Sequence, residues 1–194
     1  MALPTGPLRV TLTHAERPER LYARRMRPFD GSVDVGDGRR YAKVVFPVED
    51  EPGVESESMW TEVLPGGLYR LKNIPVWKSG VSLEDVVAGR RRGDQIRYHS
   101  VRQRAGHSTY RIAFQDPGGT ARQQPELDRL IEMGCGCERA SKRLVAIDVP
   151  AEVDIDAIYG LLEAGMAQGT WWFDELHCGH PLGDPSRPGD IPAR

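Results

Sequence analysis

The stretch from residue 107 to residue 176 alternates strand-like and helix-like patterns, and this order limits the folds open to the chain. HSTYRIAF, CGCER, RLVAIDV and TWWFDEL read as strands because they are short and rich in β-branched, aromatic or alternating residues. PELDRLIEMG and the stretch after Asp154 carry apolar residues at helical spacing. The resulting order, β-α-β-β-α-β, predicts a ferredoxin-like half over residues 106–181, with strand order 4-1-3-2.

The two predicted helices have recognisable ends. Pro125 is expected near the start of the first helix and Gly134 just beyond its end. Asp154 is expected to cap the second helix, which Gly169 ends. The second helix places apolar residues on one buried stripe: Ile155, Ile158, Tyr159, Leu162 and Met166.

Residues 41–105 predict a different kind of structure, made of short strands. YAKVVFPVE, SMWTEVL, LYRLKNI, VSLEDVV and QIRYHSVRQR are strand-like runs, and Pro65-Gly66-Gly67 is a hairpin signal. Four or five such strands favour a small antiparallel barrel or a curled sheet. We therefore predict an α+β protein in which a small antiparallel β-barrel-like half packs on the ferredoxin-like half.

Two further segments flank these halves. Residues 1–40 form an arginine-rich extension, in which LRVTLTH is expected as a strand, PERLYARRM as a short helix and FDGSVDVGDGRR as a loop. Residues 182–194 are rich in proline and are expected to form an irregular tail.

Composition indicates a soluble cytoplasmic protein. The chain is 39% hydrophobic and 28% charged, and it lacks both a secretory signal pattern and an apolar run of the roughly 20 residues that span a membrane. The chain has three cysteines, an odd number that does not indicate a disulfide framework. Free cysteines favour a reducing compartment.

Positive charge is concentrated in one stretch. Between residues 90 and 111 there are seven arginines and a single acid, Asp94, although the net charge of the chain is −2. The plain interpretation is a solvated hairpin surface, and the functional one is contact with an acidic protein or with nucleic acid. The candidate binding residues are Arg90, Arg91, Arg92, Arg97, Arg102 and Arg104.

The cysteines lie in two patches, GCGCE and HCGH. Cys135, Cys137, Cys178 and His180 (or His177) offer the four ligands of a zinc site. The C-x-C spacing is a weak zinc signature, and the predicted strand order puts the patches on opposite edges of the sheet, roughly 14 Å apart. A folded-back tail or a dimer interface is needed to bring them together. The alternatives are that two of the cysteines form a redox pair, or that the cysteines act as small apolar residues, with no cofactor.

Three other groups invite a functional interpretation. His107 precedes Ser108, but neighbouring strand residues face opposite ways, so His107 is expected to join the two halves by hydrogen bonds rather than to activate Ser108. Glu84 and Asp85 are expected to be structural, with Asp85 in a capping arrangement with Ser82. One of the paired residues Trp171 and Trp172 is expected at the surface, and Trp171 is taken with His107 as a candidate binding residue.

The chain resembles the bacterial domain-of-unknown-function family 4265 over roughly residues 41–181. The resemblance rests on VVFPVEDEPG, MWTEVLPGGLYRLKNIPVWKSGVSLEDVV, AGHSTYRI and MGCGCE with LVAIDVP. It implies a compact cytosolic domain and no assigned activity.

The sequence contains no P-loop, dinucleotide fingerprint or HExxH motif. We therefore expect a non-enzymatic binding or regulatory protein, of the immunity or accessory type, that recognises the acidic surface of another protein. Nucleic-acid binding by residues 90–104 and a metalloprotein or enzyme using the Cys/His patches are the alternatives.

Overall fold

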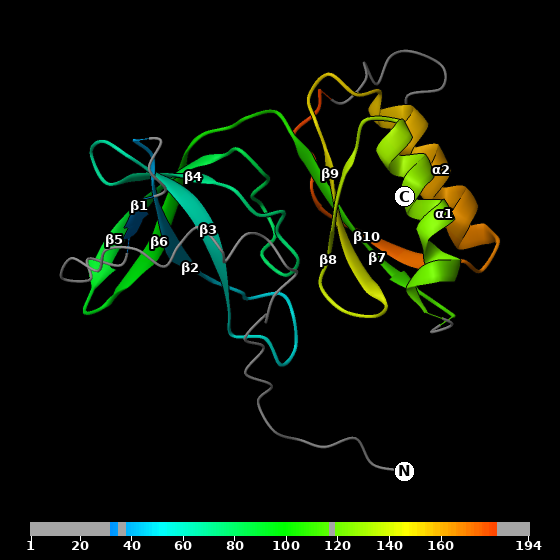
Figure 1. Cartoon of the computed structure of the whole chain (residues 1–194), viewed down its shortest axis with the longest axis horizontal. Coiled ribbons are helices and arrows are strands. Elements are labelled where there is room, and N and C mark those ends of the chain that lie inside the picture. The colour runs from blue at the N-terminus through cyan, green and yellow to red at the C-terminus, as the bar shows by residue number, and fades with distance from the viewer. Residues whose placement is uncertain (1–31, 35–37, 117–118, 182–194) are drawn as a thin grey trace, which may run out of the picture.

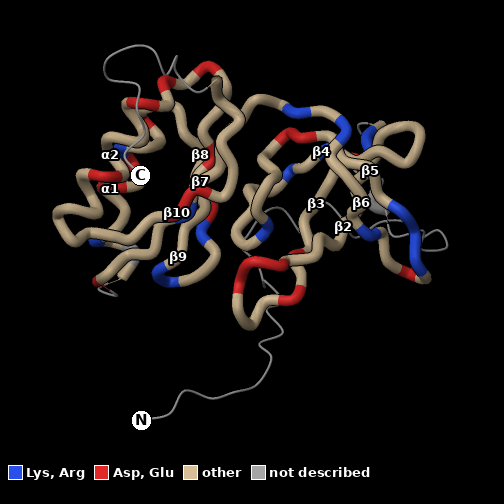
Figure 2. The backbone as a smooth tube through the Cα atoms, turned by 180° about the vertical axis from the view of Figure 1, so that it is seen from behind, with Lys and Arg blue, Asp and Glu red and all other residues tan. Residues whose placement is uncertain are grey.

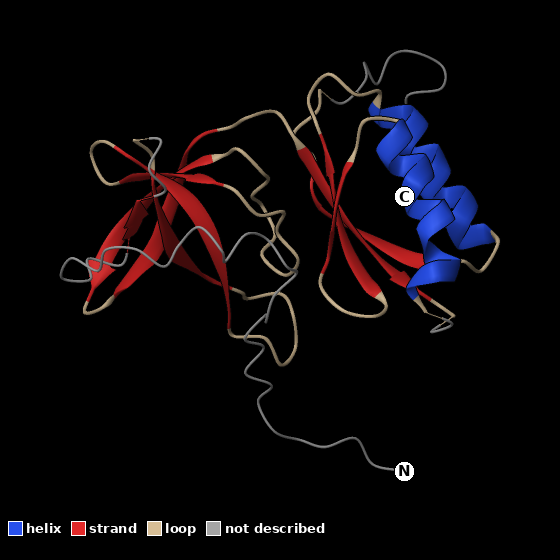
Figure 3. Ribbon diagram, viewed as in Figure 1, coloured by secondary structure: helices blue, strands red, loops and turns tan. Residues whose placement is uncertain are grey.

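The computed structural model describes residues 32–34, 38–116 and 119–181, and these form two parts, each built on a β-sheet (Figures 1 and 3). Among these residues no helix is long and apolar enough to cross a membrane. The strand expected at LRVTLTH, the helix expected at PERLYARRM and the proline-rich tail lie outside the described residues. The mixed α+β class predicted from the sequence is confirmed.

The N-terminal part is a small barrel. Six strands follow one another in sheet order as in sequence: β1 (Ser32–Asp34), β2 (Arg40–Pro47), β3 (Ser56–Leu64), β4 (Leu68–Leu71), β5 (Val86–Arg92) and β6 (Gln95–Gln103). Parallel pairing of Val44 with Ile96 and of Val45 with Arg97 joins β2 to β6 and closes β2–β6 into a barrel. The predicted barrel is confirmed, but the loop predicted before residue 40 is wrong at β1, which pairs with β2.

Every second side chain along β2 points into the barrel and fills its core. Ala42, Val44 and Phe46 are fully buried, whereas the residues between them point outward or are partly exposed. The predicted turn at Pro65-Gly66-Gly67 joins β3 to β4, with Leu64 opposite Leu68. Both glycines adopt the left-handed φ values, 77° and 74°, that a tight turn demands and glycine accepts most easily.

The VSLEDVV stretch is not one strand. Only its last two residues begin β5, while residues 81–85 form a turn that sends the buried Val81 into the barrel core. Glu84 has a φ of 65°, and the Ser82 N–H donates to the Asp85 carboxylate. The strand prediction fails here because this turn is held by side-chain contacts, which the apolar pattern does not report.

The C-terminal part is a four-stranded sheet with two helices. Its elements are β7 (Ser108–Phe114), α1 (Thr120–Glu132), β8 (Gly136–Arg139), β9 (Leu144–Val149), α2 (Ile155–Ala167) and β10 (Trp171–His177). The sheet order is β10-β7-β9-β8 with antiparallel neighbours, which is the order 4-1-3-2. Both helices lie on the face of this sheet turned away from the barrel (Figure 3).

Most predicted helix ends agree with the structure. Asp154 caps α2, accepting hydrogen bonds from the N–H groups of residues 156 and 157, and Gly134 and Gly169 follow the helices with positive φ. Helix α1, however, begins at Thr120 and contains Pro125, which the sequence placed near the helix start. The extra turn is held by buried Gln123, whose side chain accepts from Arg139 and donates to the Asp116 carbonyl.

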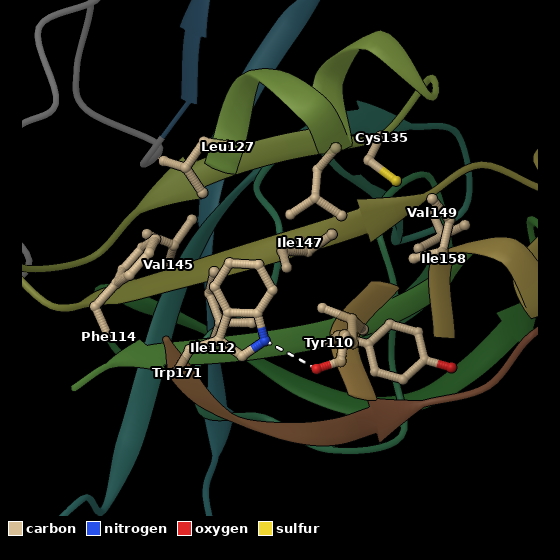
Figure 4. Close-up of a cluster of buried hydrophobic side chains, with 12 residues drawn as sticks. Tyr110, Ile112, Phe114, Leu127, Cys135, Val145, Ile147, Val149, Ile158 and Trp171 are labelled. Atoms are coloured by element: carbon tan, nitrogen blue, oxygen red, sulfur yellow. Dashed lines mark hydrogen bonds between the residues drawn. The ribbon is translucent and has the colours of Figure 1, made fainter. Parts of the chain in front are cut away.

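The helices and the sheet enclose a core built around Trp171 (Figure 4). Its ring contacts Phe114 edge-on at 5.7 Å, and its Nε1–H donates to the Leu162 carbonyl at 3.0 Å. The ring lies against Gly165 of α2, where an added Cβ would come within 2.2 Å of it. The absence of a side chain at this glycine is therefore what lets the indole approach the helix. Tyr159 and Met166 were expected in the buried stripe, but they are 40% and 38% exposed.

The connecting segment between β4 and β5 of the barrel, residues 72–85, bridges the two parts by packing on the open face of the four-stranded sheet. Ile74 and Val76 contact Ala146 of β9 in a small apolar cluster. The Glu138 carboxylate of β8 accepts from the side chain of Asn73 and from the backbone of Ile74. These contacts, rather than any made by His107, join the halves.

Thr109 and Arg111 of β7 add to this interface. The Thr109 hydroxyl donates to Ser82 at 2.8 Å. The Arg111 guanidinium donates to the Val76 carbonyl, pairs with Glu51 and lies 5.1 Å from the centre of the Trp77 ring. The interface is therefore both polar and apolar.

The contact between Gly165 and Trp171 gives a stability prediction. Gly165→Ala should lower the free energy of unfolding by about 1–3 kcal/mol, because the methyl group overlaps the buried indole. Gly160→Ala on the exposed side of α2 is the matched control, since nothing lies within 4 Å of its Cβ position. This control should raise stability by about 0.5–1 kcal/mol through helix propensity. Urea denaturation measures the free energy of unfolding of both variants. If Gly165→Ala and Gly160→Ala changed it equally, the packing of Trp171 on Gly165 would be contradicted.

Candidate arginine pocket

The arginine-rich stretch forms the β5–β6 hairpin, which turns at Gly93 and Asp94. Pairing places Arg90 opposite Arg97 and Arg92 opposite Gln95. Ile96 points into the barrel core, so its neighbour Arg97 points outward, and Arg90 shares that outer face. Figure 2 shows the Lys and Arg positions gathered along this hairpin.

An open pocket of about 510 Å³ lies where β6 meets β2. The two strands pair through only two residue pairs, although β6 continues to Gln103. The pocket is lined by residues of β2, of the chain as it enters β3 and of the β5–β6 hairpin: Val45, Pro47, Glu55, Ser56, Arg90, Arg92, Gln95, Arg97, Tyr98 and His99. Three of the predicted arginines therefore meet at one pocket.

Strand β6 contains two β-bulges. Tyr98 pairs with Gly89 and Ser100 with Ala88, which leaves His99 as an extra residue of β6. Arg102 is extra in the same way, between the residues that pair with Val87 and Val86. A bulge re-aims side chains and increases local twist. The first bulge therefore sets the direction of His99, which lines the pocket.

The charges of the pocket are not neutralised within the described chain. Arg90 and Arg92 have no ion pair or hydrogen bond among the described residues, and Arg97 donates only to the Gln95 side chain, at 3.3 Å. Glu55 lines the same pocket, yet no described cation lies within ion-pair distance of it. This site therefore presents three guanidinium groups and one carboxylate that are available to a ligand.

The remaining predicted arginines do not line this pocket. Arg104 donates to the Gly80 carbonyl at 2.7 Å and to Asp85 at 2.9 Å, and the Asp85 side chain is 1% exposed. Asp85 also accepts from the Ala105 N–H. Arg104 therefore has a structural contact, because the buried carboxylate of Asp85 requires a partner. Arg91 and Arg102 are exposed but lie outside the pocket lining.

The prediction that one of two neighbouring tryptophans lies at the surface is confirmed, but the exposed residue is not the one chosen as a binding candidate. One of the pair is at the surface, but it is Trp172, which is 62% exposed, whereas Trp171 is 1% exposed. The even-numbered residues of β7 and the odd-numbered residues of β10 face the helices, so Trp171 enters the core. A direct binding role for Trp171 is therefore excluded by its burial.

The suggested zinc ligands do not come together. Among the described residues no group of three or more His, Cys, Asp or Glu side chains is placed to hold a metal ion. Cys135 and Cys137 pack against the helix-side core, and Cys178 lies beyond β10, 3.7 Å from the Ser108 hydroxyl. The two patches are at opposite edges of the sheet, as the strand order requires.

His180 closes the end of the C-terminal part. Its Nε2 lies 3.1 Å from the carbonyls of Pro150 and Val153, so this nitrogen carries the proton. Its Nδ1 therefore accepts from the Ser108 hydroxyl at 2.7 Å. The Ser108 oxygen in turn accepts from the N–H groups of residues 179 and 180. This buried serine is fully engaged in holding the chain that follows β10.

His107 was expected to link the two halves, and this is wrong. Its Nδ1 lies 2.9 Å from the carboxylate of Asp148, on β9 of the same half. Burial raises the pKa of Asp148, and the hydrogen bond from His107 opposes that rise. His107 does not line the arginine pocket.

Sequence reasoning missed Glu55, Ser56, Val45, Pro47, Gln95, Tyr98 and His99 as pocket residues. His99 and Gln95 lie inside the arginine-rich stretch, so the charge pattern could have indicated them as candidate binding residues. The residues of β2 and β3 carry no such signal, because only barrel closure brings them beside β6.

The structural role of Arg104 can be separated from binding. Arg104→Ala should lower the free energy of unfolding by about 1–3 kcal/mol, because it leaves the buried Asp85 without its cation. Arg102→Ala, an exposed neighbour on β6, is the control and should change stability by less than about 0.5 kcal/mol. Chemical denaturation measures both, and equal stabilities of the two variants would contradict the role given to Arg104.

Thiol labelling tests the placement of the cysteines. Burial raises the pKa of Cys135 to about 12 and that of Cys137 to about 11. Both therefore stay protonated at pH 8, and iodoacetamide should modify them much more slowly in the native than in the denatured protein. Mass spectrometry of the labelled peptides gives the rates, and a chelator should not change them. Acceleration by a chelator would restore the zinc interpretation.

The comparisons bear on fold and family only. The chain is similar to the structure titled "Novel crystal structure of a hypothetical protein from Neisseria gonorrhoeae", with 17% identity and a TM-score of 0.61, over 72% of this chain and 94% of that one. This likeness concerns the fold alone. No curated protein matches the chain. Residues 57–173 match the domain of unknown function DUF4265, a narrower range than the resemblance drawn from the sequence. The chain therefore belongs to the DUF4265 family.

Proposed function

We propose that the protein is a non-enzymatic binding protein that recognises an acidic segment of another protein at the arginine pocket. The observation that carries this proposal is the gathering of Arg90, Arg92 and Arg97 at one pocket without an acidic partner in the described chain. Guanidinium groups bind carboxylates through paired, charge-assisted hydrogen bonds. An acidic partner is thus the ligand that this arrangement favours.

The wider setting of the proposal follows from the sequence. The free cysteines favour a reducing compartment, and the sequence carries no cofactor motif. Both features support a cytoplasmic, bacterial protein of the regulatory, immunity or accessory type. We also place the C-terminal half among ferredoxin-like folds, on the basis of its 4-1-3-2 strand order and its two helices on one face. On this account that half supports the barrel and does not make the contact.

Nucleic acid is the second candidate, and the same arginines favour it. Two observations weigh against it: the net charge of −2 and the Glu55 carboxylate in the pocket, which repels phosphates. An enzymatic use of Ser108 is disfavoured because this hydroxyl is buried and hydrogen-bonded on all sides.

Affinity capture with pocket variants tests the proposal. Wild-type protein and the triple variant R90A/R92A/R97A are immobilised and exposed to a bacterial lysate, with and without nuclease treatment. The wild type should retain an acidic protein that the triple variant loses. Retention should weaken between 50 and 300 mM salt, chosen as about the range over which screening becomes strong.

The control removes the same charge elsewhere. R122A/R129A/K142A changes three exposed cations of the C-terminal part, outside the pocket, and should retain the partner as the wild type does. Loss in both triple variants would indicate a non-specific charge effect. Loss of the partner on nuclease treatment would favour nucleic acid instead.

A further inference from the structure

We infer that the arginine pocket selects a dipolar peptide segment, one that presents a carboxylate to the arginines and an ammonium or N–H donor to Glu55. This inference rests on the proposed function and names the chemistry of its partner. It assigns to Glu55 the part of a specificity-determining residue, which separates mixed-charge protein segments from uniformly anionic ligands.

The two charges come from different walls of the pocket. Glu55 lies just before β3, and its carbonyl accepts from the Val48 N–H at 3.0 Å, which closes the turn between β2 and β3. Arg90, Arg92 and Arg97 lie on the β5–β6 hairpin. The backbones that carry the opposite charges are therefore fixed by separate hairpins.

These opposite charges line one pocket without pairing. No described arginine comes within 4.0 Å of the Glu55 carboxylate, and no described acid pairs with Arg90, Arg92 or Arg97. Had the walls been closer, the charges would have neutralised each other and left little attraction for a ligand. Kept apart across the pocket, they favour a ligand whose own charges are opposed in the same way.

The surroundings fit a peptide. Val45 and Pro47 give the pocket an apolar strip beside the charges, and Ser56 and Gln95 offer hydrogen-bonding side chains. A phosphodiester chain would bring negative charge to the arginines and to Glu55 alike. Exposed charge pairs of this kind change affinity by up to about fivefold each, which is enough to set a preference.

Two matched peptides test the inference by fluorescence anisotropy. Both are labelled and capped and carry four glutamates, and they differ at two positions that are lysine in one and serine in the other. A single-stranded decanucleotide is the third probe. Wild-type protein should bind the lysine peptide roughly threefold more tightly than the serine peptide, and both more tightly than the oligonucleotide.

Glu55→Gln should abolish that preference and strengthen binding of the serine peptide and the oligonucleotide by about two- to fivefold. Glu49→Gln, an exposed acid outside the pocket lining, is the control and should keep the wild-type preference. R90A/R97A should weaken binding of both peptides by about five- to 25-fold, since it removes two of the three guanidinium groups.

The outcomes separate the two proposals. If the wild type binds both peptides equally and Glu55→Gln behaves like Glu49→Gln, the role of Glu55 is overturned while protein recognition stands. If neither peptide binds the wild type, or R90A/R97A binds them as well as the wild type, recognition of acidic peptide at this pocket fails as well. Tighter binding of the oligonucleotide than of either peptide overturns both in favour of nucleic acid.

Discussion

The carboxylate of Glu57, buried at the start of β3, accepts hydrogen bonds from three consecutive backbone N–H groups, those of Val76, Trp77 and Lys78. Burial raises the pKa of this carboxyl group, and the three backbone donors oppose the rise. Without these donors a carboxylate at 4% exposure would be strongly unfavourable. The bonds fix the middle of the connecting segment against the barrel, and the packing of the two halves follows from that position.

On its other side, the same segment covers the open face of the four-stranded sheet. Glu138 holds the beginning of the segment, Thr109 bonds to Ser82 near its end, and the Gly80 N–H donates to the Leu176 carbonyl. The sheet is thereby covered on both faces, by helices on one and by this segment on the other (Figure 1). The arginine pocket lies between the β5–β6 hairpin and the residues that directly precede Glu57, so one of its walls is next to this anchored carboxylate.

Sequence-based predictions were correct where the backbone conformation or an unpaired backbone N–H group requires one particular kind of residue. Pro65-Gly66-Gly67 makes its hairpin and Asp154 caps its helix, because a left-handed turn and unpaired N–H groups make demands that few residues meet. The start of α1 could not be predicted in this way. Its first turn depends on Gln123, whose contacts with Arg139 and the Asp116 carbonyl come from other elements.

The sequence by itself determined the class of the protein, the barrel hairpin and the presence of a dense arginine surface, because periodicity, turn residues and charge are local properties. Only the tertiary structure decided which arginines are available: Arg104 is bound to a buried carboxylate, while Arg90, Arg92 and Arg97 meet at a pocket with Glu55. It also put Trp171 inside and Trp172 outside. The physical reason is that availability depends on what packs against a side chain, and these neighbours come from strands and loops distant in sequence.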